Sequence, residues 1–214
     1  MPATSDGVDV PTEAAAVAAS YRRLERPISG AVAIIVTLVA AGAFLSLPLL
    51  WGVAVALVAL VAVRLPIVRS GGTTTLATDA DPDAVRDDFE SPCPPPLAFQ
   101  WGIADAIERT DRGWEYTISY LFGLRSTRVT VELRAGDDAS DLELVVTAGG
   151  RPWGTYDVVI DEDDGRTTVE ITVDSDRRFG LRRLPQWFVA ERYRAAALEA
   201  QGYSVVERDV TLSR

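Results

Sequence analysis

An uncharged apolar stretch from Ile28 to Val63 is the feature that most constrains how this chain can fold. A single helix of that length would extend about 54 Å at ~1.5 Å per residue, whereas the hydrocarbon core of a bilayer is roughly 30 Å thick. Two shorter helices fit that thickness. Pro48 marks the break, because proline lacks a backbone donor and suits the first turn of a new helix. We therefore predict a transmembrane helical hairpin over residues 28–66, with helices over 28–46 and 49–66.

The arginines on both sides of this stretch set its expected orientation. Basic flanks favour the cytoplasmic side, so both termini are predicted to be cytoplasmic in a multi-pass cell-membrane protein with two spans. A signal peptide would be shorter and would begin earlier. The other alternative is a buried hairpin in a globular protein, but globular helices carry a polar face and neither half has one. The flanking residues are Arg22, Arg23, Arg26, Arg64 and Arg69.

The charged residues indicate a halophilic source. The chain has 31 acidic against 21 basic residues, a formal net charge of -10, and every basic residue is arginine. An acidic surface without lysine is typical of halophilic, and here haloarchaeal, proteins, in which molar salt screens the self-repulsion. An actinobacterium with an acidic proteome is the alternative. Nucleic acid is excluded as a partner, because binding the phosphate backbone requires a basic surface.

The absence of histidine and lysine restricts catalysis and metal binding. Histidine-dependent triads, lysine Schiff bases and P-loops all require residues that the sequence lacks. The single cysteine, Cys93, forms neither an internal disulfide nor a zinc site of the usual kind. A carboxylate with a raised pKa is the remaining acid or base, and nothing singles one out. We predict no cofactor, no metal site and no catalytic residue.

Residues 73–214 are predicted to form one domain, after a partly disordered cytoplasmic segment over 1–27 and a short linker over 67–72. Alternating apolar and polar side chains predict a run of strands, with a weaker strand over 103–110 and a tight hairpin at Asp164-Gly165. Asp81 and Pro82 predict the N-cap and first turn of a helix that ends near Glu90. A long helix is predicted over 185–201 and a last strand over 203–212.

The opening of this domain resembles the START-like helix-grip family, also called SRPBCC or polyketide-cyclase-like. The resemblance rests on TTLATDADPDAV, from Thr74 to Val85, and on the order strand, helix, six antiparallel strands and long helix over most of residues 73–201. It implies an α+β fold in which a curved antiparallel sheet wraps the long C-terminal helix around an apolar cavity. A proline run in place of the second short helix, and a strand after the long helix, depart from the family pattern.

Aromatic side chains are the candidate lining of that cavity, and ordinary core packing is the alternative for each. One helix leaves surplus volume on a broad concave sheet, which favours a pocket for an apolar molecule such as a lipid, isoprenoid or quinone. We therefore expect a membrane-anchored binding domain. The alternatives are a non-catalytic scaffold or interaction subunit of a membrane complex, with an unknown protein partner, and a carboxylate-based cyclase. The candidate residues are Trp101, Trp114, Tyr116, Tyr120, Phe122, Trp187 and Phe188.

Four further features each have a functional and an ordinary structural explanation. Asp161–Gly165 resembles the start of a calcium loop, but Thr172 stands where the bidentate glutamate belongs, which favours a solvated hairpin tip. Residues 79–83 could hold a cation, although helix capping explains them. Cys93 could be lipidated, or it is an inert loop thiol. A basic cluster could contact anionic lipid headgroups or balance nearby acids; its members are Arg177, Arg178, Arg182 and Arg183.

Overall fold

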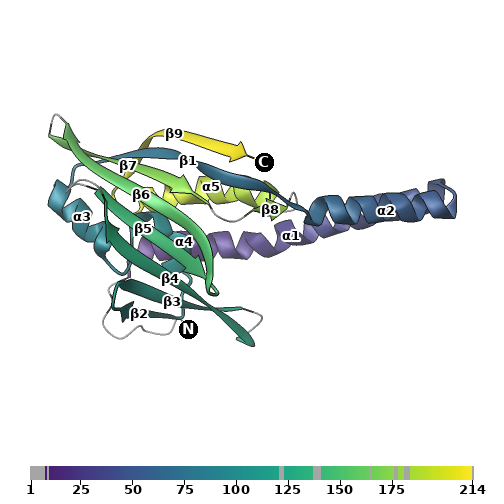
Figure 1. Cartoon of the computed structure of the whole chain (residues 1–214), viewed down its shortest axis with the longest axis horizontal. Helices are drawn as coiled ribbons and strands as arrows, with labels where there is room; N and C mark the ends of the chain where they lie inside the picture. The colour runs from purple at the N-terminus through teal and green to yellow at the C-terminus, as the bar shows by residue number, and fades with distance from the viewer. Residues whose placement is uncertain are drawn as a thin grey trace.

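The computed structural model describes residue 8 and residues 10–120, 123–136, 141–163, 165–175, 178–180 and 184–213. Figure 1 shows a curved sheet with helices packed on it and a helical arm that extends away from it. The elements in chain order are α1 (Thr12–Ser46), α2 (Leu49–Arg64), β1 (Pro66–Thr78), α3 (Pro82–Glu90), η1 (Pro95–Leu97), α4 (Ala98–Trp101), β2 (Ala106–Thr110), β3 (Gly113–Tyr120), β4 (Arg125–Ala135), β5 (Asp141–Ala148), β6 (Arg151–Asp163), β7 (Arg166–Asp174), β8 (Phe179–Gly180), α5 (Leu184–Glu199) and β9 (Ser204–Ser213).

The sheet is antiparallel throughout its described pairs. Its order is β2-β3-β4-β5-β6-β7-β1-β8, and β9 also pairs with β1. The strands from β2 to β7 follow one another in sequence, as expected for a run of hairpins. β1 and β9 join the sheet only through pairings between distant parts of the chain, with Leu76 opposite Val169 on one side and Val205 on the other.

Alternation along the strands separates the two faces of the sheet, because successive side chains of a strand point to opposite sides. The inward residues are the apolar ones that the sequence pattern predicts, and they form the core with Val85 and Phe89 of α3. Val131, Leu144 and Val169 are fully buried or nearly so. The predicted run of strands and the helix that begins at Pro82 are therefore confirmed.

The segment expected to be a linker is part of the sheet instead. Gly71 and Gly72 lie within β1, opposite Asp174 and Val173 of β7 and opposite Thr211 and Val210 of β9. Gly72 has a φ of 147°, and a Cβ on it would overlap the carbonyl oxygen of Asp209. Gly72 therefore permits the close approach of β9 to β1, and Gly71 lies close to the Val173 carbonyl of β7. In the sequence alone, two adjacent glycines look like a flexible joint.

The first turns of α1 belong to the core of the domain. Ala14 and Ala18 are fully buried, and a Cβ on Gly102, at the end of α4, would press against Ala18. Tyr21 stacks on Phe99 of the α4 segment, with ring centroids 4.8 Å apart. The sequence predicts a separate cytoplasmic segment over 1–27, whereas the structure packs Thr12–Tyr21 of it against the rest of the domain.

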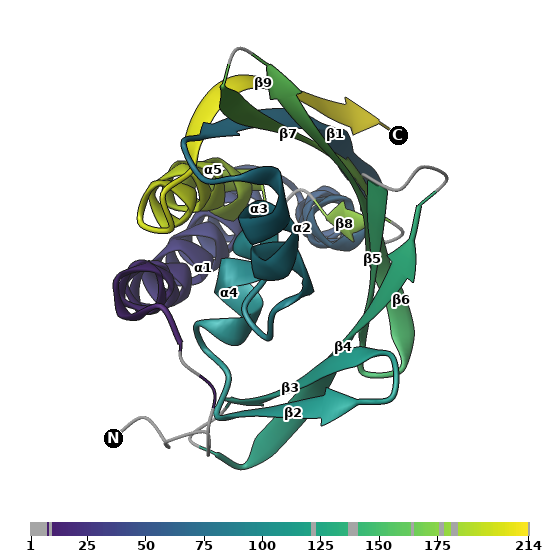
Figure 2. The ribbon, with the colours of Figure 1, turned by 90° about the vertical axis from the view of Figure 1, so that its left-hand side faces the viewer.

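The helix-grip prediction is wrong about what fills the curve of the sheet. Figure 2 shows α3 and α4 within the curve, and α5 beside α1 at its open side. α5 packs mainly along α1 and also touches η1, α4 and β9. The sheet therefore does not wrap a single C-terminal helix. The short helices after β1 occupy that space, because the proline run turns the chain back under the sheet.

The uncharged stretch forms a helical hairpin, but the prediction that it crosses a membrane is wrong. α1 ends at Ser46 and α2 begins at Leu49, so the break lies where Pro48 predicts it. Of the helices that the structure describes, none combines the length with the apolar character needed to cross a bilayer.

This finding corrects the predicted transmembrane α-hairpin and, with it, the predicted two-span location in the cell membrane. The outer half of the hairpin, which we call the arm, comprises residues 34–62. Large apolar side chains are exposed on it, including Leu45 at 90% and Leu50 at 85%.

Candidate functional site

A cleft lies between the sheet and α5, lined by residues of both. Its floor is the inner face of β6, β7, β1 and β9, where two rows of residues run across the strands. One row is Tyr156, Val173, Gly72 and Val210, and the next includes Ile171, Thr74 and Arg208. Long-range strand pairing thus brings together residues that lie more than a hundred positions apart in sequence.

The opposite wall of the cleft comes from α5 and η1. Arg194 and Leu198 lie one helical turn apart on α5, so both face the sheet, and Pro96 of η1 lies beside them. The lining is completed by Gly71, Trp153, Gly154 and Ser175. The space encloses about 120 Å³. The cleft is therefore mostly apolar, with two guanidinium groups and a few hydroxyl groups.

The electrostatics of the cleft are set by burial and by its arginines. Burial raises the pKa of the Tyr156 hydroxyl, and the positive charge of Arg194 opposes part of that rise. Tyr156 therefore stays protonated at neutral pH and offers a hydrogen-bond donor. Among the described lining residues none is acidic, although the chain as a whole carries a net charge of -10.

The aromatic residues predicted to line the cavity do not line the cleft where the structure describes them. Three of them donate hydrogen bonds to backbone carbonyl groups. Trp101 and Tyr116 are buried, and their polar atoms donate hydrogen bonds to the carbonyl oxygens of Pro94, at 2.9 Å, and Pro92, at 3.1 Å. Trp114 donates in the same way to the carbonyl oxygen of Glu90, at 3.1 Å. These three side chains hold the segment from Glu90 to Pro94 against the core, and the carbonyl oxygen of Pro94 also accepts from the Leu97 N–H, at 3.0 Å.

The remaining candidates also fall outside the cleft or outside the described part of the chain. Tyr120 is 41% exposed at the end of β3. Phe122 and the side chains of Trp187 and Phe188 lie outside the described residues. None of the four candidates with described side chains lines the cleft.

Sequence reasoning missed the residues that do line it, above all Arg194 and Arg208. A signal for Arg194 exists, since it precedes the apolar Leu198 by four residues and such a pair shares a helix face. The sequence around Arg208 carried no comparable signal. The face of the sheet on which its side chain lies depends on how β9 pairs with β1, and that pairing has a register shift near Thr75 and Leu76.

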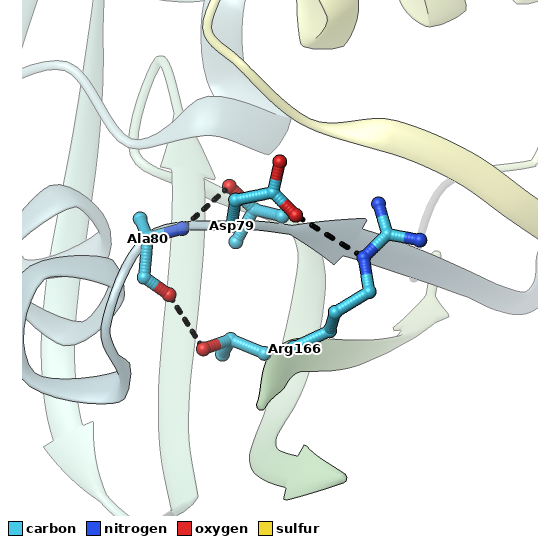
Figure 3. Close-up of polar contacts among 5 residues, drawn as sticks. Asp79, Ala80 and Arg166 are labelled. Carbon is cyan, nitrogen blue, oxygen red and sulfur yellow. Dashed lines mark hydrogen bonds and ion pairs between the residues drawn. The ribbon is translucent and has the colours of Figure 1, made fainter. Parts of the chain in front are cut away.

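The acidic turn between β1 and α3 is explained by contacts within the protein (Figure 3). Asp79 forms an ion pair with Arg166, at 3.2 Å between Oδ1 and Nε. The Thr167 hydroxyl donates to the carbonyl oxygen of Ala80, whose N–H donates to Thr78. Asp81 stands at the N-cap of α3 without a capping hydrogen bond from its side chain, so the predicted capping bond is absent.

The other motifs give no further site. Over the residues described, no three side chains of metal-binding type come together. Cys93 is only 6% exposed and lies in the core, where a lipid-transferring enzyme would not reach it. Of the basic cluster only Arg178 is described, and it is exposed; Arg177, Arg182 and Arg183 lie outside the described residues.

Comparisons with known proteins give a distant structural likeness only. No family model matches the chain, and no curated protein does. A conserved protein from Geobacillus kaustophilus is similar with a TM-score of 0.46 and 11% identity, over 61% of this chain and 91% of that one. The protein Ms6760 from Mycobacterium smegmatis has a TM-score of 0.39 and 14% identity, over 60% of this chain and 85% of that one.

Proposed function

We propose that this protein binds an apolar small molecule in the cleft between the sheet and α5. The observation that carries the proposal is the cleft itself, where Ile171, Val173, Val210 and Leu198 face one open space. Apolar surface that converges on a concavity with a few polar groups is the usual form of a ligand site.

The size of the cleft limits what part of a ligand it holds. Its volume of about 120 Å³ is close to that of a cavity of roughly 150 Å³ that admits benzene. It therefore accepts a ring or a short hydrocarbon segment, and the rest of a longer ligand would extend out of the opening. Burial of four methylene groups contributes about 3 kcal/mol, so tight binding requires polar contacts as well.

A carboxylate-based enzyme is less well supported by this cleft. Within the described lining there is no Asp or Glu to act as general acid or base. Tyr156, whose pKa is raised by burial, holds its proton too firmly to serve as a base near neutral pH.

The proposal is tested by filling the cleft. Val210→Phe places a larger side chain in the floor, whereas Val206→Phe makes the same change on the same strand at a position that is 66% exposed. Calorimetric titration of the full chain with 1-octanol should show binding that Val210→Phe weakens at least about tenfold and Val206→Phe leaves unchanged. Absence of binding to the wild-type chain, or an equal effect of both variants, would contradict the proposal.

The exposed apolar arm favours a second candidate function, that of an interaction subunit. Exposed apolar patches of this kind mark interaction surfaces, and a second copy of the chain is the simplest partner. Leu50→Gln on the arm, at a residue 85% exposed, is matched by Leu124→Gln after β3, at a residue 84% exposed. Sedimentation should show an oligomer that only Leu50→Gln disperses. A monomeric wild type, or an oligomer that persists in Leu50→Gln, would remove a self-association role.

A further inference from the structure

The cleft carries positive charge although the protein as a whole is acidic. The geometry of the strands places the acidic side chains and the arginine on opposite faces of the sheet. Asp157, Asp174 and Asp209 are exposed, and each directly follows or precedes a residue that lines the cleft. Neighbouring residues of a strand point to opposite faces. The acids therefore lie on the outer face, while the inner face keeps Arg208 and the apolar rows.

The two arginines approach the cleft from different elements. Arg208 lies opposite Thr74 in the pairing of β9 with β1, and Arg194 extends from α5 on the other side of the cleft. Arg194 and Tyr156, which is on β6, line the same space, and the positive charge of Arg194 acts on the Tyr156 hydroxyl. Both side chains are partly buried, and both also interact within the chain.

A partly buried guanidinium favours an anionic oxygen group. Arginine remains charged at any physiological pH, and its planar fork matches a carboxylate or a phosphate with two parallel hydrogen bonds. In a partly buried site this attraction is screened by salt less than at an exposed surface. A ligand anion would add to, or exchange with, the contacts that the arginines already make within the chain.

We propose that the cleft selects amphiphiles that end in a carboxylate or a phosphate, with the anionic group held by Arg194 and Arg208 and the hydrocarbon resting on Val173, Val210 and Leu198. This inference rests on the proposed function and adds the ligand class to it. The Tyr156 hydroxyl and the Ser175 hydroxyl, both on the lining, are further donors for the same group.

The headgroup comparison on the wild-type chain is the first test and needs no variant. Octanoate, octyl phosphate and 1-octanol share one chain length and differ in charge, so calorimetric titration of the full protein isolates the headgroup. We expect at least one of the two anions to bind about tenfold or more tightly than 1-octanol. The tighter of the two identifies carboxylate or phosphate as the group that the cleft prefers.

Variants then assign the preference to the arginines. Arg194→Gln and Arg208→Gln should each reduce anion affinity about tenfold and leave 1-octanol affinity unchanged. Arg192→Gln, on an exposed residue two positions from Arg194 on α5, is the matched control and should change neither. Circular dichroism confirms that each variant is folded, and the wild-type headgroup comparison stands even where a variant is not.

The outcomes distinguish a failure of the anion selectivity from a failure of the proposed binding of an apolar molecule. If 1-octanol and the anions bind equally and Val210→Phe weakens all of them, the apolar cleft stands and the anion selectivity is refuted. If inorganic phosphate binds as tightly as octyl phosphate, the amphiphile assignment is refuted. If neither the anions nor 1-octanol bind, the proposed function itself fails.

Discussion

Alkaline pH should unfold this protein steeply, because three tyrosine hydroxyls are buried in it. Tyr116, Tyr203 and Tyr156 are 0%, 2% and 9% exposed. Burial raises the pKa of all three. For Tyr203 the hydrogen bond to Asp88, 2.8 Å between the two oxygens, and the charge of that carboxylate raise it further.

The size of the effect follows from proton linkage. A tyrosine in the unfolded chain has a pKa of about 10, so above that pH the unfolded state loses protons that the folded state retains. The contribution to stability is thus fully present below about pH 10 and is lost as the pH rises. Each tyrosine lowers the free energy of unfolding by about 1.4 kcal/mol per pH unit, which makes about 4 kcal/mol for three. A typical domain has only 5–15 kcal/mol in total.

The composition of this chain simplifies the measurement. It contains neither lysine nor histidine, and arginine keeps its charge throughout the alkaline range. The buried thiol of Cys93 also ionises in the unfolded chain above about pH 8.5, but its contribution is the same in the wild type and in the tyrosine variants. Urea unfolding of the full chain, followed by circular dichroism at pH values from about 8 to 11.5, gives the slope directly. Tyr116→Phe and Tyr203→Phe should each reduce the slope by about 1.4 kcal/mol per pH unit above about pH 10. Tyr120→Phe, at a residue 41% exposed, is the control that retains all three buried hydroxyls.

Two results would refute this reasoning. One is a slope that is the same in the wild type, Tyr116→Phe and Tyr203→Phe. The other is tyrosinate absorbance that develops in full near pH 10 while circular dichroism still reports a folded chain, since the buried hydroxyls would then ionise as freely as exposed ones.

Three further changes test how the fold is held, each by urea unfolding at neutral pH. Trp101→Phe should cost about 1–3 kcal/mol, because it removes the buried indole hydrogen bond to Pro94 and leaves part of the ring's space empty, although the Pro94 carbonyl keeps its bond from the Leu97 N–H. Gly72→Ala should cost at least about 1–3 kcal/mol, since its Cβ overlaps the β9 backbone; a neutral result would show that β9 can move away. Thr167→Val should cost about 1 kcal/mol by removing a buried hydrogen bond, whereas Arg166→Ala, which breaks an exposed ion pair, should change stability by less than about 1 kcal/mol. The reverse order would contradict the burial argument.

Some local elements were predictable from the residues within them. Pro48, in the middle of the uncharged stretch, predicts the helix break, and α1 does end just before it, although Pro27 lies inside α1 without ending it. Alternation from Val129 to Leu133 and from Val169 to Val173 assigns a buried face to each strand, which the structure confirms. Pro82 at the first turn of α3 is a further case.

The candidate site was not predictable, because it depends on which elements meet. Trp101 and Tyr116 are aromatic residues of the kind that line cavities, yet their polar atoms hold the proline segment instead. The cleft arises where β9 returns to β1 beside two glycines. Nothing near Arg208 in the sequence reports that it faces Arg194 across that space.

By itself, the sequence determined the helix break at Pro48, the order of strands from β2 to β7 and the inward side of each strand. Those properties depend on backbone geometry within a few residues. The tertiary structure alone decided that α1 enters the core at Ala14 and Ala18, that Gly71 and Gly72 lie inside a strand, and that two arginines share a cleft. Each of these rests on contacts between distant segments, whose free energy depends on how complete surfaces fit together rather than on any local pattern.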